Sequence, residues 1–533
     1  MAMAWLSGNK GRAKVISAVV ASGLLAGCTS AAGGDGRRAD APVAGGVAEC
    51  TKAEAPGDSR DRQTRAMWIA TVAGIDWPGD PGHSVARKKS DYRKMLDRAK
   101  ALGVNAVFVQ VRPSADAFYK SPYEPWSRWI SGRQGRDPGF DVLDFFVKEA
   151  HARDLEFHAW FNPYRVGRGT DRTQLHPDNP ARRNPSWVRA YGDGLWYDPG
   201  IPQVRELTTK VVMDVVRRYD IDAVHFDDYF YPYPESGDFP DGATYKRYGG
   251  GKSKGDWRRG NVDTLVKGLS EQIHRAKPWV RFGISPFGVW RNKRTDPAGS
   301  ATAALQSYDD IYADTRKWVK EGWVDYVTPQ LYWEIGHRTA DYRPLVEWWA
   351  RLVKGTGVEL TIGQASYRAG EAGAWRDPAE LSRHLTLNER FPEIRGDVYF
   401  SAKDLIGDRG GSTSRLRRDH YATAAIPPPV DGGRRPAPAG KVTASADAGG
   451  VRVRWHLSPS ERATSYAVYR VDGKAERCAP VPTDRLLVTT RGAGIVDPTA
   501  AAGKTYTYYV TALDRLHHES APARGATVTA ARG

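Results

Sequence analysis

Two carboxylates, Asp227 and Asp228, stand side by side where a short apolar run ends, in the sequence AVHFDDYFYP at residues 223–232. The run is typical of a buried strand, and successive side chains of a strand point to opposite faces. His225 and Asp227 therefore share one face, whereas Asp228 lies at the strand end. His225 and Asp228 can tune the pKa of Asp227 by charge and by hydrogen bonding. The structural alternative is an N-cap aspartate beside a salt-bridged one.

Acids at a strand end need a scaffold, and the chain has eight strand-like segments, each followed by a helical or loop stretch. The strand-like segments are residues 65–72, 106–113, 156–165, 223–232, 281–290, 325–333, 359–368 and 396–405. Helical periodicity marks residues 91–102, 141–154, 203–218, 309–321, 342–353 and 378–390. Strands alternating with helices favour parallel βαβ units. Eight such units predict an α/β fold of the (β/α)8 TIM-barrel type, whose chemistry lies at the carboxyl ends of the strands.

The same alternation predicts which side chains face the barrel axis near its catalytic end. They are mostly polar, and so many polar groups would be costly in a sealed core, so we expect an open site. The predicted inward residues are Gln110, Arg112, His158, Trp160, Asn162, His225, Asp227, Ser285, Gln330 and Tyr332, with Glu334 just beyond, and Tyr399, Ser401 and Lys403 on the last strand.

The N-terminus predicts export. Three basic residues precede an apolar run at residues 15–25, which is short for a membrane span and typical of a signal-peptide core. The run ends in LAGC, which resembles a bacterial lipobox, so we expect cleavage before Cys28 and acylation of its thiol. Lipid would then anchor the chain to the extracytoplasmic face of the cell membrane. The alternative is an ordinary secretory peptide with an incidental cysteine.

Length and charge limit the classes of protein. A chain of 533 residues indicates at least two folded units. The net charge of +16 favours a polyanionic setting such as a cell wall or an anionic membrane surface. No basic recognition helix, zinc-finger spacing or RNA-binding signature accompanies this charge, so no nucleic-acid partner is expected.

Composition divides the chain into five parts: a signal peptide at residues 1–27, a flexible tether at 28–62, the barrel at 63–425, a proline-rich linker at 426–440 and a C-terminal domain at 441–533. The linker predicts few contacts between the two folded units. If Cys28 is acylated, only Cys50 and Cys478 remain to pair, and the sequence leaves that pairing open. Metal-ligand spacings are absent from the sequence, and we expect neither a metal nor a cofactor.

Short alternating strands follow the linker, at residues 451–455, 465–470 and 505–511. This spacing predicts a small all-β, immunoglobulin-like sandwich. Trp455, Tyr469 and residues 503–514 resemble a fibronectin type III module. We expect its tyrosines, Tyr466, Tyr469, Tyr506 and Tyr508, to lie in the core rather than to bind sugars.

Six motifs of the barrel, in this order and at strand ends, resemble the glycosyl-hydrolase-like family 10. They are RAMW at 65–68, QVRP at 110–113, AWFNPYR at 159–165, HFDDYFYP at 225–232, ISPFG at 284–288 and TPQLYW at 328–333. The resemblance implies a bacterial envelope glycoside hydrolase whose substrate is the glycan strands of peptidoglycan. Glycoside hydrolysis uses two acids, or one acid aided by the substrate. Asp227 is our first catalytic candidate, Glu334 its expected partner and Asp228 the competitor for that role.

The remaining polar and aromatic residues at the strand ends are expected to bind a cell-wall polysaccharide, by hydrogen bonds or by stacking on sugar rings. They are Gln110, Arg112, His158, Trp160, Asn162, Tyr164, Arg165, His225, Tyr229, Ser285, Gln330, Tyr332, Trp333 and Lys403. For each aromatic residue, core packing is the competing interpretation.

Two other functions stay open from the sequence. One is a non-catalytic glycan-binding lipoprotein, which needs the aromatic residues but not the acids. The other is a metal-dependent polysaccharide deacetylase, for which His158, His225 and Asp227 form a thin set of ligands. The chain is expected to be a monomer.

Overall fold

The structure is a computed structural model that describes residues 62–476, 478 and 481–531. The predicted signal peptide, Cys28 and Cys50 lie outside the described residues. Cys478 is disulfide-bonded, and its partner also lies outside them. Within the described part of the chain, no helix combines the length and the apolar character that crossing a membrane requires.

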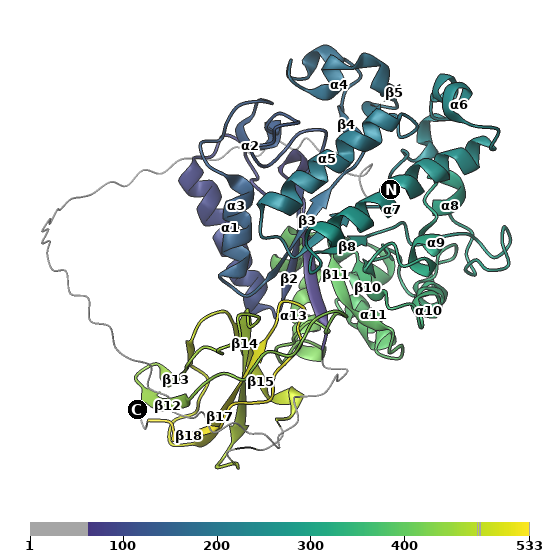
Figure 1. The fold of residues 1–533 in the computed structure, drawn as a ribbon. Coiled ribbons are helices and arrows are strands. Elements are labelled where there is room, and N and C mark those ends of the chain that lie inside the picture. Colours follow the sequence, from purple (N-terminus) through teal and green to yellow (C-terminus); the bar gives the residue numbers. More distant parts are fainter. Residues whose placement is uncertain (1–61, 477, 479–480, 532–533) are drawn as a thin grey trace, which may run out of the picture. The chain divides into compact units, whose positions relative to one another are not determined.

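Eight parallel strands close into a barrel, which confirms the predicted (β/α)8 fold (Figure 1). Around the barrel the strands follow the order β1-β11-β10-β9-β8-β7-β3-β2. Their bounds are β1 (Thr64–Ile69), β2 (Ala106–Arg112), β3 (Glu156–Phe161), β7 (Ala223–Phe226), β8 (Arg281–Ile284), β9 (Tyr326–Val327), β10 (Glu359–Gln364) and β11 (Ile394–Tyr399). The strand-like patterns thus marked the right segments, but several ran on into the loops that form the catalytic face.

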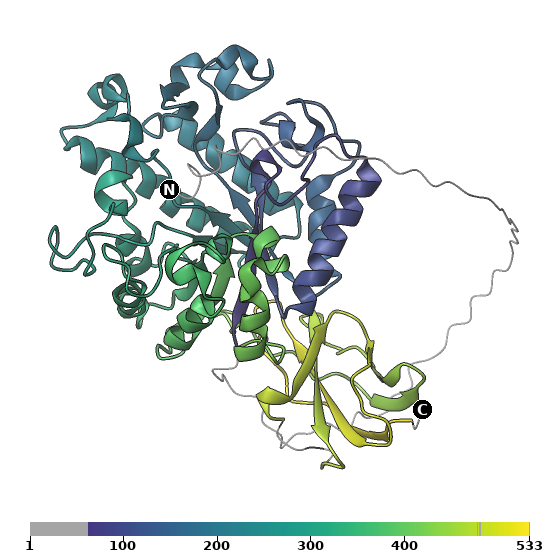
Figure 2. The same cartoon turned by 180° about the vertical axis from the view of Figure 1, so that it is seen from behind.

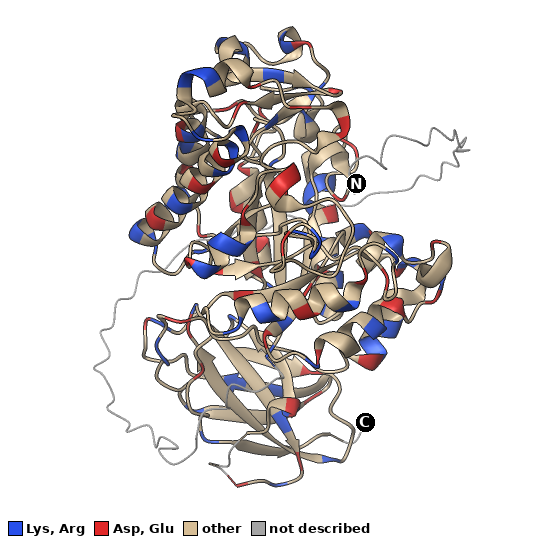
Figure 3. Cartoon of the chain, turned by 90° about the vertical axis from the view of Figure 1, so that its right-hand side faces the viewer, with Lys and Arg blue, Asp and Glu red and all other residues tan. Residues whose placement is uncertain are grey.

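Helices cover the outside of the barrel, as the view from behind also shows (Figure 2). The larger ones are α1 (Val85–Ala101), α3 (Val142–His151), α5 (Pro202–Arg218), α7 (Lys254–Ala276), α10 (Tyr342–Val353) and α11 (Glu380–Asn388). Shorter ones are α2 (Arg128–Ser131), α4 (Pro180–Arg183), α6 (Gly242–Tyr248), α8 (Ser307–Asp310), α9 (Thr315–Lys320), α12 (Ala402–Ile406) and α13 (Ser412–Asp419). Figure 3 shows basic and acidic residues interspersed along several of these helices.

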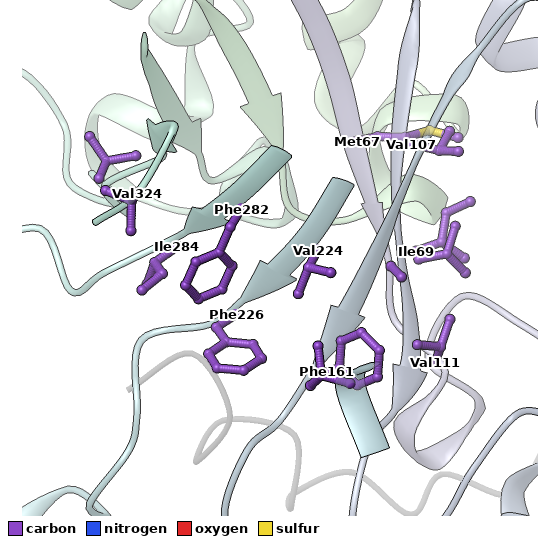
Figure 4. Packing of buried hydrophobic residues seen from close by; sticks show 14 of the residues in the cluster. Met67, Ile69, Val107, Val111, Phe161, Val224, Phe226, Phe282, Ile284 and Val324 are labelled. Carbon is purple, nitrogen blue, oxygen red and sulfur yellow. The ribbon is translucent and has the colours of Figure 1, made fainter. Parts of the chain in front are cut away.

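The strands bury apolar residues on their outer face, between sheet and helices. Val224 and Phe226 of β7 and Phe282 and Ile284 of β8 belong to this cluster (Figure 4). Trp68 of β1, by contrast, belongs to a separate cluster inside the barrel. Strand alternation therefore assigned the two faces of β7 correctly, because successive side chains of a strand point to opposite faces whatever covers them.

On β11 the predicted alternation is wrong by one residue. Val398 lies in the interior cluster, whereas Tyr399 packs outside, where its hydroxyl lies 2.7 Å from that of Tyr421. The register between β10 and β11 shifts between Leu360 and Ile362. An extra residue in a strand reverses the alternation beyond it, and nothing local in the sequence announces it.

A line of hydrogen bonds runs through the barrel interior. Trp68 Nε1 donates to His225 Nε2 over 3.2 Å. His225 Nδ1 lies 3.2 Å from the Tyr326 hydroxyl, which lies 2.9 Å from His158 Nδ1. Because an indole N–H can only donate, His225 accepts at Nε2 and carries its proton on Nδ1. Burial lowers the pKa of both histidines, so they are neutral. A Cβ at position 283 would lie 2.1 Å from the Tyr326 ring, so only Gly283 leaves room for it.

A small antiparallel sheet is formed by the segment between β3 and α5. It consists of β4 (Arg165–Arg168), β5 (Val188–Tyr191) and β6 (Gly194–Tyr197), in the order β4-β6-β5. The sheet carries Arg165 and Trp196 at the mouth of the barrel.

The C-terminal module is all-β, as predicted. One sheet has the order β12-β13-β16 and the other β15-β14-β17-β18. The strands are β12 (Val442–Asp447), β13 (Gly450–Trp455), β14 (Ser465–Asp472), β15 (Leu486–Thr490), β16 (Gly494–Asp497), β17 (Thr505–Leu513) and β18 (Ala526–Thr529). The predicted core tyrosines Tyr466, Tyr469, Tyr506 and Tyr508 are all buried.

The expectation of few contacts between barrel and module is wrong. His517 Nε2 lies 2.9 Å from the Glu156 carboxylate at the start of β3. Arg515 lies 3.2 Å from Asp222, just before β7. The first linker residue, Ile426, is buried in a cluster with module residues. A proline-rich composition predicts stiffness, but it does not determine what the segment packs against.

We predict that Glu156→Gln lowers the melting temperature substantially. Glu156 is buried and pairs with Arg281 over 2.6 Å as well as with His517. Breaking a buried pair costs about 3–5 kcal/mol when a charge is left without a partner. Arg281 keeps Glu359 as a second partner over 3.2 Å, so we expect a loss near the lower end of this range. Thermal unfolding followed by circular dichroism measures this loss. Glu206→Gln is the control, because it breaks an exposed pair with Lys210, worth about 0–1 kcal/mol. Equal melting temperatures for the two variants would contradict the prediction.

Candidate active site

Asp227 and Asp228 follow β7 at the carboxyl end of the barrel strands, where side chains from several strands converge. Both are nearly buried, with exposed fractions of 4% and 7%. Two adjacent carboxyls in so little water repel each other when both are charged, so their protonation states must differ near neutral pH.

Asp228 is surrounded as an ionised carboxylate would be. Gln330 Nε2 donates to its Oδ1 over 3.1 Å, and the Tyr233 hydroxyl donates to its Oδ2. The same Gln330 nitrogen donates to the Ser285 carbonyl over 3.0 Å, which fixes the orientation of the amide because a carbonyl can only accept. Both oxygens of Asp228 therefore act as acceptors.

Asp227 has a different set of partners. Its Oδ2 accepts from Asn162 Nδ2, whereas its Oδ1 is buried without a hydrogen-bond partner among the described residues. A carboxyl oxygen that accepts no hydrogen bond is a poor place for negative charge and a suitable place for a proton.

The electrostatics agree with this division. Burial raises the pKa of Asp227 well above its usual range, and the charge of Asp228 adds to the rise, whereas Tyr229, Arg165 and Trp160 oppose it. Burial also raises the pKa of Asp228, to about 6, and the hydrogen bond from Gln330 opposes that rise. Near neutral pH the pair therefore consists of one neutral carboxyl and one carboxylate, a proton donor beside a fixed negative charge.

Two predicted residues lie behind Asp227. Gln110 of β2 and Asn162 after β3 are both 0% exposed, and Gln110 Nε2 donates to Asn162 Oδ1 over 2.5 Å. Both therefore point into the barrel next to the two aspartates, as the alternation predicted, but neither is exposed at the surface of the site.

The predicted residues His158, His225 and Ser285 lie deeper in the barrel. His225 Nε2 is 3.0 Å from the Ser285 hydroxyl and is bonded to Trp68. The described hydrogen bonds of His225 are with Trp68, Tyr326 and Ser285 and not with Asp227. These residues form the floor of the site.

Aromatic and basic residues surround the mouth. The Arg165 guanidinium lies 5.8 Å from the Trp196 ring, whose centroid is 5.6 Å from that of Tyr229. On the opposite strands, Tyr332 packs 6.3 Å from Phe400. Trp333 packs 5.5 Å from Phe287. Tyr332 and Trp333 are partly exposed, which leaves ring surface available to a ligand.

Glu334, the expected partner of Asp227, has other contacts. It accepts from Trp375 Nε1 over 2.9 Å and lies 3.6 Å from Arg368, with its side chain 25% exposed. Both partners come from the segment between β10 and α11. The described contacts therefore tie Glu334 to the rim, whereas Asp228 is the carboxylate beside Asp227.

Three further predicted residues lie apart from the acids. Arg112 is completely buried, pairs with Glu124 and donates to the Pro163 carbonyl over 3.0 Å, so it supports the loop after β3. Tyr164 is also completely buried. Lys403 is exposed at the start of α12.

Some residues of the site were not anticipated. Tyr233 lies just beyond the aromatic run after Asp228, and Trp68 had the signal of an inward position on β1. Asp76, in the loop after β1, accepts from the Ser401 hydroxyl over 2.8 Å and from Lys403 N over 2.9 Å. Burial raises the pKa of Asp76 to about 6. No spacing in the sequence connects it with residues more than three hundred positions away.

The described residues contain no group of three or more His, Cys, Asp or Glu placed to hold a metal ion. The set that the sequence offered for a metal-dependent enzyme, His158, His225 and Asp227, instead forms hydrogen bonds with tyrosine, tryptophan, serine, asparagine and glutamate side chains.

Comparison with known proteins identifies the family of this chain. A family model described as glycosyl hydrolase-like 10 matches residues 63–379. The chain belongs to this family. Glycosyl hydrolase YngK of Bacillus subtilis (strain 168) is 46% identical over 486 residues, which cover 88% of this chain and 94% of the relative. Glycosyl hydrolase DigH of Escherichia coli (strain K12) is 41% identical over 360 residues, 63% of this chain and 82% of the relative. The protein is a glycoside hydrolase.

We predict that Asp227→Asn raises the melting temperature, and more so at pH 8 than at pH 4. Burial raises the pKa of Asp227 in the folded state, so its ionisation opposes folding once the pH exceeds the ordinary value near 3.9. The uncharged amide removes this penalty, and we expect a gain on the order of 1 kcal/mol.

Differential scanning calorimetry at the two pH values measures the gain. Asp472→Asn is the control, because Asp472 is exposed and its substitution should change the melting temperature little at either pH. A lower melting temperature for Asp227→Asn at pH 8 would contradict the assignment of a neutral, buried carboxyl.

Proposed function

We propose that the protein cleaves the glycan strands of bacterial cell-wall peptidoglycan, with Asp227 as the proton donor and Asp228 as the charged partner. The observation that carries the proposal is the unequal pair. Both oxygens of Asp228 have donors, whereas Asp227 keeps one oxygen without a partner among the described residues. Glycoside hydrolysis needs this division between a protonated and an ionised carboxyl.

The reaction follows from these states. Asp227 gives its proton to the glycosidic oxygen that leaves the anomeric carbon, and the carboxylate of Asp228 stabilises the positive charge that develops on that carbon. Water then adds to the carbon, and the proton it loses restores Asp227. Because the two aspartates are nearly buried, substrate binding must displace side chains that cover them.

Two features support peptidoglycan as the substrate: the residues around the site and the predicted location of the protein outside the cell membrane. The aromatic rim of Trp196, Tyr332 and Trp333 suits sugar rings, and Arg165 suits an acidic substituent on them. A lipobox at Cys28 would hold the enzyme on the extracytoplasmic face of the cell membrane, next to the wall. The all-β module, proposed to be of the fibronectin type III kind, would travel with it, and the protein would act as a monomer.

Neither alternative function gains a specific observation. A glycan-binding protein without catalysis needs no buried acid pair, and a deacetylase needs a metal site that the described residues do not assemble.

We predict that Asp227→Asn and Asp228→Asn each lower kcat by about 10²–10⁴, because each removes an ionisable group from the chemical step. Glu334→Gln should stay within a few-fold of the wild type, since Glu334 contacts Trp375 and Arg368 instead. Purified sacculi, intact and stripped of stem peptides, serve as substrates, and mass spectrometry of the new ends identifies the bond that is cut. Full turnover by Asp227→Asn would remove Asp227 from the mechanism.

We also predict that Cys28→Ala accumulates unprocessed precursor that takes up no radiolabelled palmitate. Lipidation at Cys28 leaves Cys50 as the disulfide partner of Cys478, since the chain has three cysteines. The variant should therefore keep the disulfide, which a mobility shift on reduction detects. Labelled palmitate on the variant would contradict the anchor, and loss of the disulfide would show that Cys28 pairs with Cys478.

A further inference from the structure

Two backbone N–H groups after β1 determine the orientation of the Gln110 amide. Thr71 N and Val72 N donate to Gln110 Oε1 over 3.0 and 2.8 Å. Backbone N–H groups can only donate, so the oxygen of the Gln110 amide must face them. Turning the amide over would leave two buried donors unsatisfied, at about 1–3 kcal/mol each.

This orientation passes to the next side chain. With its oxygen committed, Gln110 presents Nε2 to Asn162 and donates to Asn162 Oδ1 over 2.5 Å. Asn162 must then present Nδ2 to the catalytic pair, where it donates to Asp227 Oδ2 and to the Tyr229 hydroxyl at 2.9 Å. Two backbone groups therefore determine, through two amides, which atom meets Asp227.

We propose that Gln110 and Asn162 are positioning residues that hold the proton of Asp227 on Oδ1. A proton on Oδ2 would point at an N–H group that has no lone pair to accept it. Oδ1 accepts no hydrogen bond from the described residues, so it is the oxygen that carries the proton. After proton transfer, the N–H of Asn162 remains to stabilise the charge on Oδ2. This inference rests on the proposed catalytic role of Asp227.

This chain of hydrogen bonds from Thr71 and Val72 through Gln110 and Asn162 to Asp227, here called the relay, gives Gln110 and Asn162 a positioning role in place of the substrate binding that the sequence suggested. Gln110 and Asn162 were expected to bind substrate, but both are 0% exposed. Their side-chain hydrogen bonds join them to Thr71, Val72, Asp227, Tyr229 and each other. Substrate binding and proton positioning differ in their kinetics. Loss of a substrate contact raises KM, whereas loss of proton positioning lowers kcat.

The test uses Gln110→Met, which keeps the length of the side chain and removes the three hydrogen bonds that the amide makes with Thr71 N, Val72 N and Asn162 Oδ1. We expect kcat to fall about tenfold or more, because a misoriented acid loses its alignment with the substrate, while KM stays within about twofold. The alkaline limb of the pH profile of kcat/KM, which reports Asp227, should move to higher pH, because the ionised form loses a fixed donor. The other groups that act on Asp227, namely Asp228, Tyr229, Arg165 and Trp160, are unchanged in this variant.

A matched control is available on the same sheet. Gln364 of β10 is also 0% exposed and donates to Tyr342 and Asp397, both over 2.8 Å, away from Asp227. Gln364→Met should lose stability to a similar degree but leave kcat and the alkaline limb unchanged. Comparable kinetic changes in both variants would show that the effect is only structural and would overturn the proposal.

A second variant provides a coupling test. Asn162→Leu removes the donor to Asp227, and the double variant with Gln110→Met should be no slower than Asn162→Leu alone, because the two residues act in series. Losses that multiply, or a raised KM with normal kcat, would overturn the relay. If Gln110→Met does not fold, Asn162→Leu alone must lower kcat and shift the alkaline limb. Failure of the proposed function appears separately, as full activity of Asp227→Asn.

Discussion

Two carboxyl groups adjacent in the sequence are buried together at the end of β7. Burying a charged carboxylate costs free energy, so the surrounding residues must stabilise the one charge that remains. In water both groups would be ionised near neutral pH. At exposed fractions of 4% and 7% the two charges cannot both be solvated, so only one group is ionised. One member keeps its proton and the other is held charged by donors from Gln330 and Tyr233. The difference between two identical side chains thus comes from their hydrogen-bond partners.

The barrel supplies those partners through groups that can only donate or only accept. The Ser285 carbonyl orients Gln330, the backbone N–H groups of Thr71 and Val72 orient Gln110, and the indole of Trp68 orients His225. Each buried amide or imidazole therefore has one favourable orientation, since reversing it would leave a buried group unsatisfied. A polar barrel interior built in this way is rigid, which suits a site that must hold a proton on one atom.

The opposite end of the barrel, where the strands begin, is also polar and contains buried ion pairs. Glu156, at the start of β3, pairs with Arg281 inside the barrel and with His517 of the module. The charges of these partners outweigh the effect of burial and hold the pKa of Glu156 well below its usual range. Because Glu156 also lies 3.5 Å from His158, the module contact adjoins the line of hydrogen bonds that leads to His225. The module is thus part of the packing of the barrel.

The sequence by itself determined the (β/α)8 barrel, the all-β module and the inward direction of Gln110, Asn162 and His225, because strand alternation and helical periodicity are local properties that survive burial on both faces. It also marked Asp227 and Asp228 as the acids at a strand end. Only the tertiary structure decided what these residues do there. Gln330 reaches Asp228 from about a hundred residues away, Glu334 turns to Trp375, and a bulge reverses the faces of β11. Hydrogen-bond partners depend on distances between segments that are remote in the chain, and local patterns carry no information about such distances.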